Sequence, residues 1–224
     1  MKNTVKFLVP LMLVLLMLAS VSVKAESLKT YAVPVLSDGI NIIDTLFNFD
    51  SQKPGGISDG WTNESGKWLV KKDGNNMVLA QKAENRGSKF NVSVYKGALL
   101  RDVDMTVSVR AISGREDQGG GLVWRYTDIK NYYIVRFNPL EDNFRLYKVY
   151  NGRRIQLVSA NAKVTKGAWF KVRVVMKGNE ITCYLDGEKL ITKKDDTFTR
   201  IGKTGFWTKA DAVSDFDNFS LKGK

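Results

Sequence analysis

Arginine, tyrosine and amide side chains recur between residues 125 and 207 at spacings that can bring them together on a ligand. A guanidinium group binds a carboxylate through two parallel hydrogen bonds, while phenol and amide groups bond to hydroxyls. Aromatic rings add apolar contact area that ends in a polar edge. This chemistry suits a ligand that is rich in hydroxyl groups and can carry negative charge. The candidate ligand-binding residues are Arg125, Tyr132, Arg136, Asn138, Arg145, Tyr147, Gln156 and Trp207.

Alternation in the segment 131–138 predicts a strand whose two faces differ, because successive side chains of a strand point to opposite sides. One side of this segment is apolar, so Tyr132, Arg136 and Asn138 share the other side. The dipeptide Asn151-Gly152 is typical of a two-residue hairpin turn, and it predicts how the next two strands pair. In that pairing Leu146 lies opposite Leu157. The pairing adds further polar side chains to one face, namely Arg145, Tyr147, Arg154 and Gln156.

Arg125 can take either of two orientations on its strand. One parity buries Leu122, Trp124 and Tyr126. It turns the Arg125 guanidinium to solvent, whereas the opposite parity buries that charge, which is costly unless the charge is paired. We therefore expect Arg125 and Arg136 to lie on one sheet face within reach of a common ligand. The alternative for each of these residues is an ordinary solvated face crossed by Arg–Asp pairs.

The absence of histidine restricts the chemistry that this chain can perform. No histidine and a single cysteine occur in 224 residues. These counts exclude Ser/His/Asp and Cys/His nucleophilic sites, His-ligated zinc and a disulfide framework. Acid–base catalysis would have to use Asp, Glu, Lys or Tyr. The single thiol, Cys183, alternates with Ile181 and Leu185, so we expect it to be buried among apolar side chains.

The first 25 residues have the pattern of a secretory signal peptide. Lys2 and Lys6 precede an apolar run over residues 7–18, and small residues lead up to Ala25, after which cleavage is expected. The run is too short to span a bilayer comfortably, so no membrane span is expected. The sequence thus predicts an exported protein, periplasmic or extracellular, with residues 26–41 as a short lead before the domain.

The remaining chain, residues 42–224, reads as β structure and as one domain. Short stretches rich in branched and aromatic residues alternate with polar ones, as in residues 103–110, and turn residues separate them. Asp186-Gly187 marks a second hairpin turn. No segment shows a sustained helical period. Many short strands with turn signals between them favour a sandwich or a barrel.

An ordered set of motifs resembles the concanavalin A-like lectin and glucanase superfamily. The central one is the glycine-rich strand 119–126 followed by Asp128 and by the Asn-Tyr-Tyr strand 131–138. The resemblance covers about residues 42–222 and is closest to 3-keto-disaccharide hydrolase-like domains, beside laminin G-like domains. Further blocks follow in the expected order, at 169–174, 184–187, 205–207 and 216–219.

The resemblance implies an all-β fold, a jelly-roll sandwich of two curved antiparallel sheets with saccharide on the concave face. It leaves two functions open, because fold alone does not fix activity. The first is an exported protein that binds an oligo- or polysaccharide without cleaving it and needs no cofactor. The second is a glycoside-cleaving hydrolase of the 3-keto-disaccharide type, with an acid–base pair drawn from Asp104, Glu116 or Asp117. The Glu-x-Asp-x-x-Glu motif of laminarinase-type enzymes is not in the sequence, which favours binding.

Two further expectations concern ions and charge. The resemblance implies a structural calcium ion between the domain start, at Asp50, and the last strand, at Asp217, since calcium accepts irregular sets of oxygen ligands. The alternative is that Asp217 accepts backbone hydrogen bonds. The formal net charge is +12, and the chain from Glu26 carries +9 because the leader holds three lysines and no acid. This charge favours an anionic partner or serves solubility, and no nucleic-acid-binding motif accompanies it.

Overall fold

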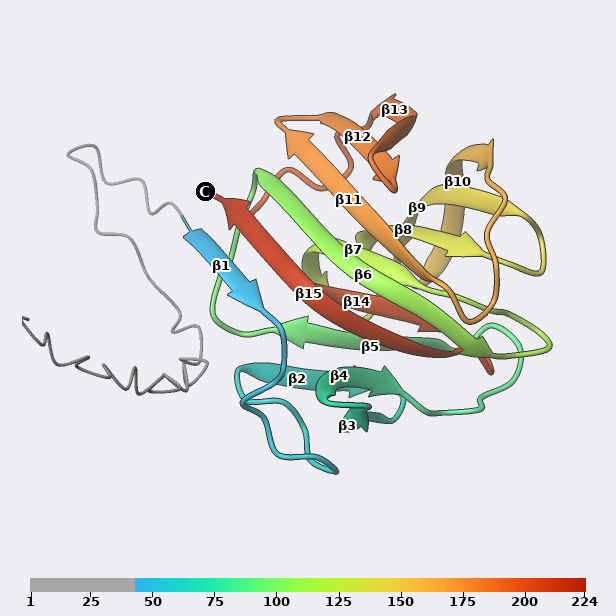
Figure 1. Ribbon diagram of the computed structural model, residues 1–224. Coiled ribbons are helices and arrows are strands. Elements are labelled where there is room, and N and C mark those ends of the chain that lie inside the picture. The colour runs from blue at the N-terminus through green and yellow to red at the C-terminus, as the bar shows by residue number, and fades with distance from the viewer. Residues whose placement is uncertain (1–42) are drawn as a thin grey trace, which may run out of the picture.

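The computed structural model describes residues 43–224, all of it strand, turn and loop (Figure 1). The expected signal peptide and lead, residues 1–25 and 26–41, lie outside the described residues. Two antiparallel sheets pack face to face and form a jelly-roll sandwich, so the predicted fold class is confirmed. None of the described residues forms a helix with the length and apolar character that crossing a membrane requires.

One sheet has eight strands, and its long central strands β6 and β15 carry the core on one face. The burial of β6 alternates along the strand, with Val103, Met105, Val107 and Val109 buried and the residues between them partly exposed. This is the alternation that the sequence predicts. In spatial order the strands are β13 (Glu188–Lys194), β12 (Glu180–Leu185), β11 (Trp169–Lys177), β6 (Val103–Ser113), β15 (Val213–Gly223), β4 (Asn76–Gln81) and β3 (Trp68–Asp73), and β1 (Ile43–Phe47) pairs with β15.

The second sheet has seven strands, and its central strands are buried on both of their faces. Phe137 and Phe206 point into the core between the sheets, where Cys183 of the facing sheet is also fully buried, as expected. In spatial order the strands are β10 (Arg153–Asn161), β9 (Asn143–Tyr150), β8 (Asn131–Asn138), β7 (Gly121–Asp128), β14 (Lys203–Lys209), β5 (Phe90–Tyr95) and β2 (Trp61–Ser65).

The hairpin between β9 and β10 forms at the predicted turn. Asn151 and Gly152 both have positive φ, 51° and 79°, as a type I′ turn requires. The register begins as expected, with Tyr150 opposite Arg153, and then shifts at a bulge that follows Gln156. Val158 therefore lies opposite Leu146, and the expected pairing with Leu157 is wrong, because a bulge adds one residue to a single strand.

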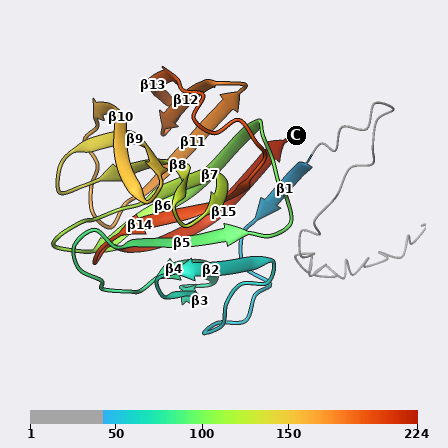
Figure 2. The ribbon, with the colours of Figure 1, turned by 180° about the vertical axis from the view of Figure 1, so that it is seen from behind.

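The seven-stranded sheet curls strongly along the direction in which its strands pair. Four strands separate β10 from β5, so in a flat sheet the two would lie about 24 Å apart. Yet the guanidinium carbon of Arg154 on β10 lies 5.7 Å from the ring centre of Phe90 on β5. Figures 1 and 2 show β9 and β10 curving away from the line of β5 and β14. The curl brings side chains from distant strands of this sheet together on its outer face.

Candidate functional site

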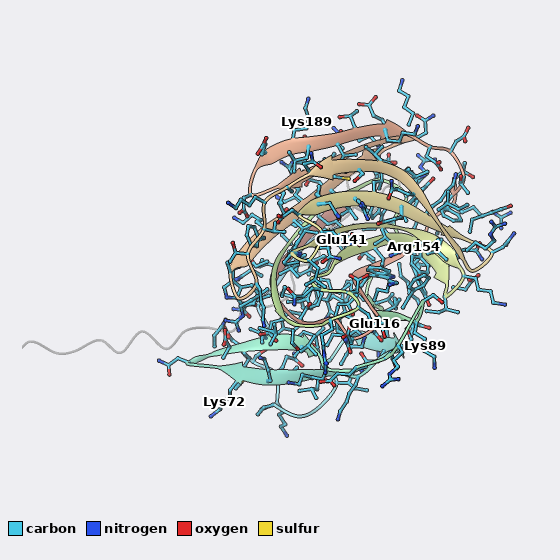
Figure 3. All side chains as sticks on the ribbon, turned by 90° about the vertical axis from the view of Figure 1, so that its right-hand side faces the viewer. Lys72, Lys89, Glu116, Glu141, Arg154 and Lys189 are labelled. Atoms are coloured by element: carbon cyan, nitrogen blue, oxygen red, sulfur yellow. The ribbon has the colours of Figure 1, made fainter. Side chains whose placement is uncertain are left out.

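The candidate site is the outer face of the curled seven-stranded sheet, which we call the curled face. Its inner part is a second apolar cluster, separate from the core between the sheets. Its outer part is polar and partly open. Figure 3 views this side of the molecule and shows Glu141 and Arg154 between Lys189 of β13 and Lys72 of β3. The apolar part comprises Val92, Val94, Val123, Tyr126, Tyr132, Ile134, Tyr147, Val149 and Trp207, with Phe90 packed against them.

Arg136 lies at the centre of the polar part and is only 1% exposed. Its guanidinium donates to the side-chain oxygen of Asn143 at 2.9 Å, to Glu141 at 3.2 Å and to the hydroxyl of Tyr147 at 3.3 Å. Its Nε is buried and has no partner among the described residues. Arg136 is therefore fixed by its neighbours while one donor stays available.

Glu141 joins two arginines at the rim of the curled face. One of its oxygens accepts from Arg145 at 2.8 Å, from Asn143 at 2.8 Å and from Arg136. The hydrogen bond from Asn143 lowers the pKa of Glu141 more than burial raises it, and the two guanidinium groups lower it further. Glu141 is thus an ionised bridge whose side chain is still 45% exposed.

Asp117 forms the second polar group of the curled face. Its carboxylate accepts from the amide of Asn138 at 3.2 Å and pairs with Lys209 at 3.3 Å. The loop that carries Asp117 is anchored by Asp211, which accepts the backbone N–H groups of three successive residues at 2.6 to 3.1 Å. Burial raises the pKa of Asp211, but these hydrogen bonds together lower it by more. The carboxylate of Asp211 is therefore ionised.

Arg154 differs from the other basic side chains of the curled face. Its guanidinium carbon lies 4.6 Å from the ring centre of Tyr147 and 5.7 Å from those of Phe90 and Trp207. Its Nη1 is buried without a partner, and no described residue forms an ion pair with it. Burial lowers the pKa of Arg154, and the charge of Arg136 adds to this effect. The group is a cation held by rings alone.

Three further buried donors on this face form no hydrogen bond of normal geometry with a described residue: the hydroxyls of Tyr126 and Tyr132 and the indole N–H of Trp207. Glu64 lies near the Tyr126 hydroxyl. Burial raises the pKa of Tyr132, so its hydroxyl stays protonated. The Trp207 N–H lies near the Tyr132 oxygen and offsets part of the increase in the pKa of Tyr132. The two groups nevertheless lack the geometry of a normal hydrogen bond. The inner part of the curled face therefore has hydrogen-bonding capacity that its own side chains do not use.

The structure brings together seven of the eight residues that the sequence selects as ligand-binding candidates. Gln156 is exposed and lies opposite Tyr147 on the neighbouring strand. Sequence reasoning also puts Arg154 on this face but does not select it, although it stands two positions from Gln156. Whether these residues bind a ligand stays a prediction. The seven are Tyr132, Arg136, Asn138, Arg145, Tyr147, Gln156 and Trp207.

Arg125 is the exception, and the expectation that it faces solvent beside Arg136 is wrong. It is 2% exposed, and its guanidinium donates to the carbonyl oxygens of Arg101 at 2.9 Å, Gly178 at 2.5 Å and Phe198. Asp102 lies 3.6 Å away. Arg125 has a φ of +47° within a bulge that reverses the alternation of β7. Tyr126 is buried as expected, but in the cluster of the curled face.

Of the carboxylates considered for catalysis, only Asp117 lies on the curled face. Asp104 belongs to the eight-stranded sheet and pairs there with Arg173 at 2.7 Å. Glu116 accepts the backbone N–H of Gly87 at 2.6 Å. An acid–base pair on this face would therefore have to combine Asp117 with Glu141, which the sequence does not single out.

The two aspartates considered for calcium meet at the hairpin between β3 and β4. Asp50 accepts the backbone N–H of Met77 at 3.0 Å, and Asp217 accepts from Asn76 at 2.8 Å and from the backbone N–H of Asn218 at 2.7 Å. Burial raises the pKa of Asp217, and the charge of Asp50 contributes. The described residues contain no group of three or more His, Cys, Asp or Glu side chains arranged for a metal. Asp217 thus accepts a backbone hydrogen bond, as the alternative to calcium predicts, and calcium binding beside Asp50 and Asp217 stays a prediction.

Comparison with known proteins identifies the family. The family model described as "3-keto-alpha-glucoside-1,2-lyase-like domain" matches residues 44–222, which is most of the chain. The chain belongs to this family. Comparison with curated proteins gives no match.

Solved structures share the fold of this 3-keto-alpha-glucoside-1,2-lyase-like domain. A carbohydrate binding module, CBM66 from Bacillus subtilis, is 21% identical with a TM-score of 0.64, over 73% of this chain and 96% of that one. The Bacteroides ovatus mixed linkage glucan GH16 protein, solved with its product, is 13% identical with a TM-score of 0.59, over 79% and 99%.

A third similar structure, the GH43 protein BlXynB from Bacillus licheniformis, is much longer than this chain. It is 15% identical with a TM-score of 0.59, over 80% of this chain but only 39% of that one. The family and these neighbours place the chain among carbohydrate-active β-sandwiches.

Proposed function

We propose that the protein is exported and binds a saccharide on the curled face without cleaving it. The observation that carries the proposal is a concentration of unused hydrogen-bonding groups. Among the described residues, nine buried side-chain polar atoms have no partner, and five of them lie on the curled face. More than nine in ten buried polar groups in folded proteins are normally paired. A ligand rich in hydroxyls would supply partners for such a cluster.

The arrangement of fixed polar groups supports the same proposal. Arg136, Asn138 and Glu141 are held by hydrogen bonds to one another or to neighbouring side chains. A ligand that meets groups already held in place loses less free energy to ordering them. Arg145 and Gln156 lie at the open edge of this set, where a second sugar unit can make contact.

Binding is favoured over cleavage by the state of the two carboxylates on the curled face. Glu141 has a lowered pKa and three donors on one oxygen, so it is a poor general acid. Asp117 is paired with Lys209 and bonded to Asn138. Cleavage of a glycoside is the second candidate function, because the family model is described as lyase-like and Asp117 is a buried carboxylate on the same face.

A glycan array with a test for released product separates these functions. We expect saturable binding of at least one glycan and no product after prolonged incubation. The variant Arg136→Gln should weaken binding of that glycan, and Arg173→Gln on the other sheet serves as the control, since Arg173 pairs with Asp104 far from this face. Absence of binding to every glycan would refute the proposal. Catalytic release of product that Asp117→Asn abolishes would establish the second candidate instead.

Export is tested separately by analysis of the mature protein. We expect the protein made in cells that can secrete it to begin at Glu26, which mass spectrometry of the purified chain detects. A chain that keeps residues 1–25 and stays in the cytoplasmic fraction would refute export and leave the binding proposal intact.

A further inference from the structure

The basic side chains of the curled face differ in whether an acid neutralises them. Arg136 and Arg145 both contact Glu141, at 3.2 Å and 2.8 Å, and Lys209 pairs with Asp117 at 3.3 Å. Arg154 alone among these four has no acidic partner in the described part of the chain. These contacts pair three of the four bases with two acids. Arg154 is the base that no described acid contacts directly, and Asp117 and Glu141 act on it only through their charge at a longer distance.

The surroundings of Arg154 hold its guanidinium in place without satisfying it. Tyr147, Phe90 and Trp207 contribute rings at 4.6 to 5.7 Å, distances at which a cation is attracted to an aromatic ring. Rings accept no conventional hydrogen bond from the N–H groups. Nη1 is buried, but Arg154 as a whole is only half-buried. Its Nε and Nη2 are absent from the buried unpartnered atoms and donate to no described residue, so they are accessible from solvent. This edge of the guanidinium is the one that binds a carboxylate bidentately.

We infer that the saccharide carries a carboxylate, as a uronic acid does, and that Arg154 binds this group. The inference rests on the proposed function and adds the chemical class of the ligand. A carboxylate matches the charge of Arg154 and the planar fork of its Nε and Nη2. The uncharged donors beside it, Trp207 Nε1 and Tyr132 Oη, suit the hydroxyls of the same sugar ring.

A hydroxyl would be a weaker match for Arg154 than a carboxylate. Hydrogen bonds to charged groups stabilise by about 1.5–3 kcal/mol, against about 1 kcal/mol for neutral pairs, and an unpaired buried charge is costly. Binding a carboxylate removes that cost, whereas binding a neutral sugar leaves it. The acidic ligand should therefore bind more tightly than its uncharged analogue.

The test compares acidic oligosaccharides with their own methyl esters, which have the same chain and no charge. The probes are oligomers of galacturonate, glucuronate and mannuronate, each beside its ester, titrated calorimetrically onto the purified protein. We expect at least one acid to bind about threefold or more tightly than its ester, which corresponds to the smaller difference between a charged and a neutral hydrogen bond. In Arg154→Gln that difference should disappear. Arg153→Gln, one residue away on the opposite side of β10, should keep it.

Each other outcome has a definite meaning. Esters that bind as tightly as every acid would overturn the inference while leaving the proposed function standing. Failure of all glycans, here and on the array, would overturn both. A single-stranded oligonucleotide of equal charge that binds as tightly as the acids, and through Arg154, would overturn the inference by showing general anion binding. Arg154→Lys, which keeps the charge without the fork, should retain only part of the preference if the bidentate contact forms.

Discussion

Two arginines of the same sheet, the buried Arg125 and the half-buried Arg154, are held in opposite ways. Arg125 directs its N–H groups at three backbone carbonyls, and Asp102 stands nearby. Arg154 is surrounded by rings and has no hydrogen-bond partner among the described residues. The first therefore belongs to the fold, because its bonds join strands that are distant in sequence. We assign the second to the proposed binding surface, since no described residue accepts a hydrogen bond from it.

The largest expected effect is the loss of stability in Arg125→Ala. Removing this fully buried side chain leaves a cavity and takes the donor from three partly buried carbonyls, and we expect the free energy of unfolding to fall by about 3–5 kcal/mol. Denaturant unfolding of both proteins measures the difference. Arg125→Lys should recover part of the loss, because one compact ammonium cannot span all three carbonyls. A change under about 1 kcal/mol together with lost glycan binding would reverse the roles that we assign to the two arginines.

The region around Arg125 also holds the clearest dependence of stability on pH. Burial raises the pKa of Asp195, but hydrogen bonds from Lys148 at 2.7 Å, Tyr133 at 2.6 Å and Thr197 at 3.0 Å outweigh it and lower the pKa to about 2. The pKa of an aspartate in an unfolded chain is about 3.9. Because the folded value is the lower one, the contribution is complete above about pH 4 and is lost as the pH falls towards 2.

Asp195→Asn should therefore lower the free energy of unfolding by about 1–3 kcal/mol at neutral pH and flatten its pH dependence between about pH 4 and 2. Denaturant titrations at several pH values measure both effects. Asp196→Asn is the matched control, since Asp196 is the exposed neighbour in the same loop. An unchanged slope in Asp195→Asn would show that other carboxylates govern this pH range.

Asp217 is an intermediate case, a buried charge with some partners and with two acids, Asp50 and Asp73, nearby. We expect calcium to bind beside Asp50 and Asp217 and to stabilise the fold by about 1–2 kcal/mol in millimolar calcium, the range expected for weak extracellular sites. Thermal unfolding in chelator and in calcium measures this. Asp217→Asn should remove the difference, and equal midpoints for the unaltered protein would refute the ion.

The smallest expected change in stability is that of Arg154→Met, and its sign is informative. Methionine keeps much of the volume against Tyr147 and Trp207 while removing an unpaired, partly buried charge. The lost attraction of the cation for the rings offsets part of this gain. We expect the free energy of unfolding to stay within about 1 kcal/mol of the original or to rise. A fall as large as that of Arg125→Ala would show that Arg154 is structural too.

The contrast between these arginines also marks where sequence reasoning succeeds and fails. Strand alternation and the Asn151-Gly152 turn predict the shared face of Arg136, Asn138 and Tyr147, because these signals are local. Arg125 is misplaced because one bulged residue reverses the alternation of β7. What holds that bulge is a set of carbonyls more than 20 positions away, which no local pattern reveals.

Arg154 shows a second limit of the sequence. Arg154 stands two positions before Gln156 on the same strand, so alternation places both on the correct face. Its contacts with the aromatic rings, however, depend on the curl of the whole sheet. Only that curl carries the guanidinium to Phe90 on β5 and Trp207 on β14. The degree of curl is set by packing between the two sheets, and the spacing of residues in the chain does not encode it locally.

Hydrogen–deuterium exchange of the purified protein with and without its glycan tests most directly the claim that the ligand lies on the curled face. With the glycan that the array identifies at saturation, we expect slowed exchange in β8, β9, β10 and β14 and unchanged exchange in β6, β11 and β12 of the other sheet. Arg154→Gln, measured at the same glycan concentration, should lose most of this protection. Protection confined to the eight-stranded sheet would contradict the account.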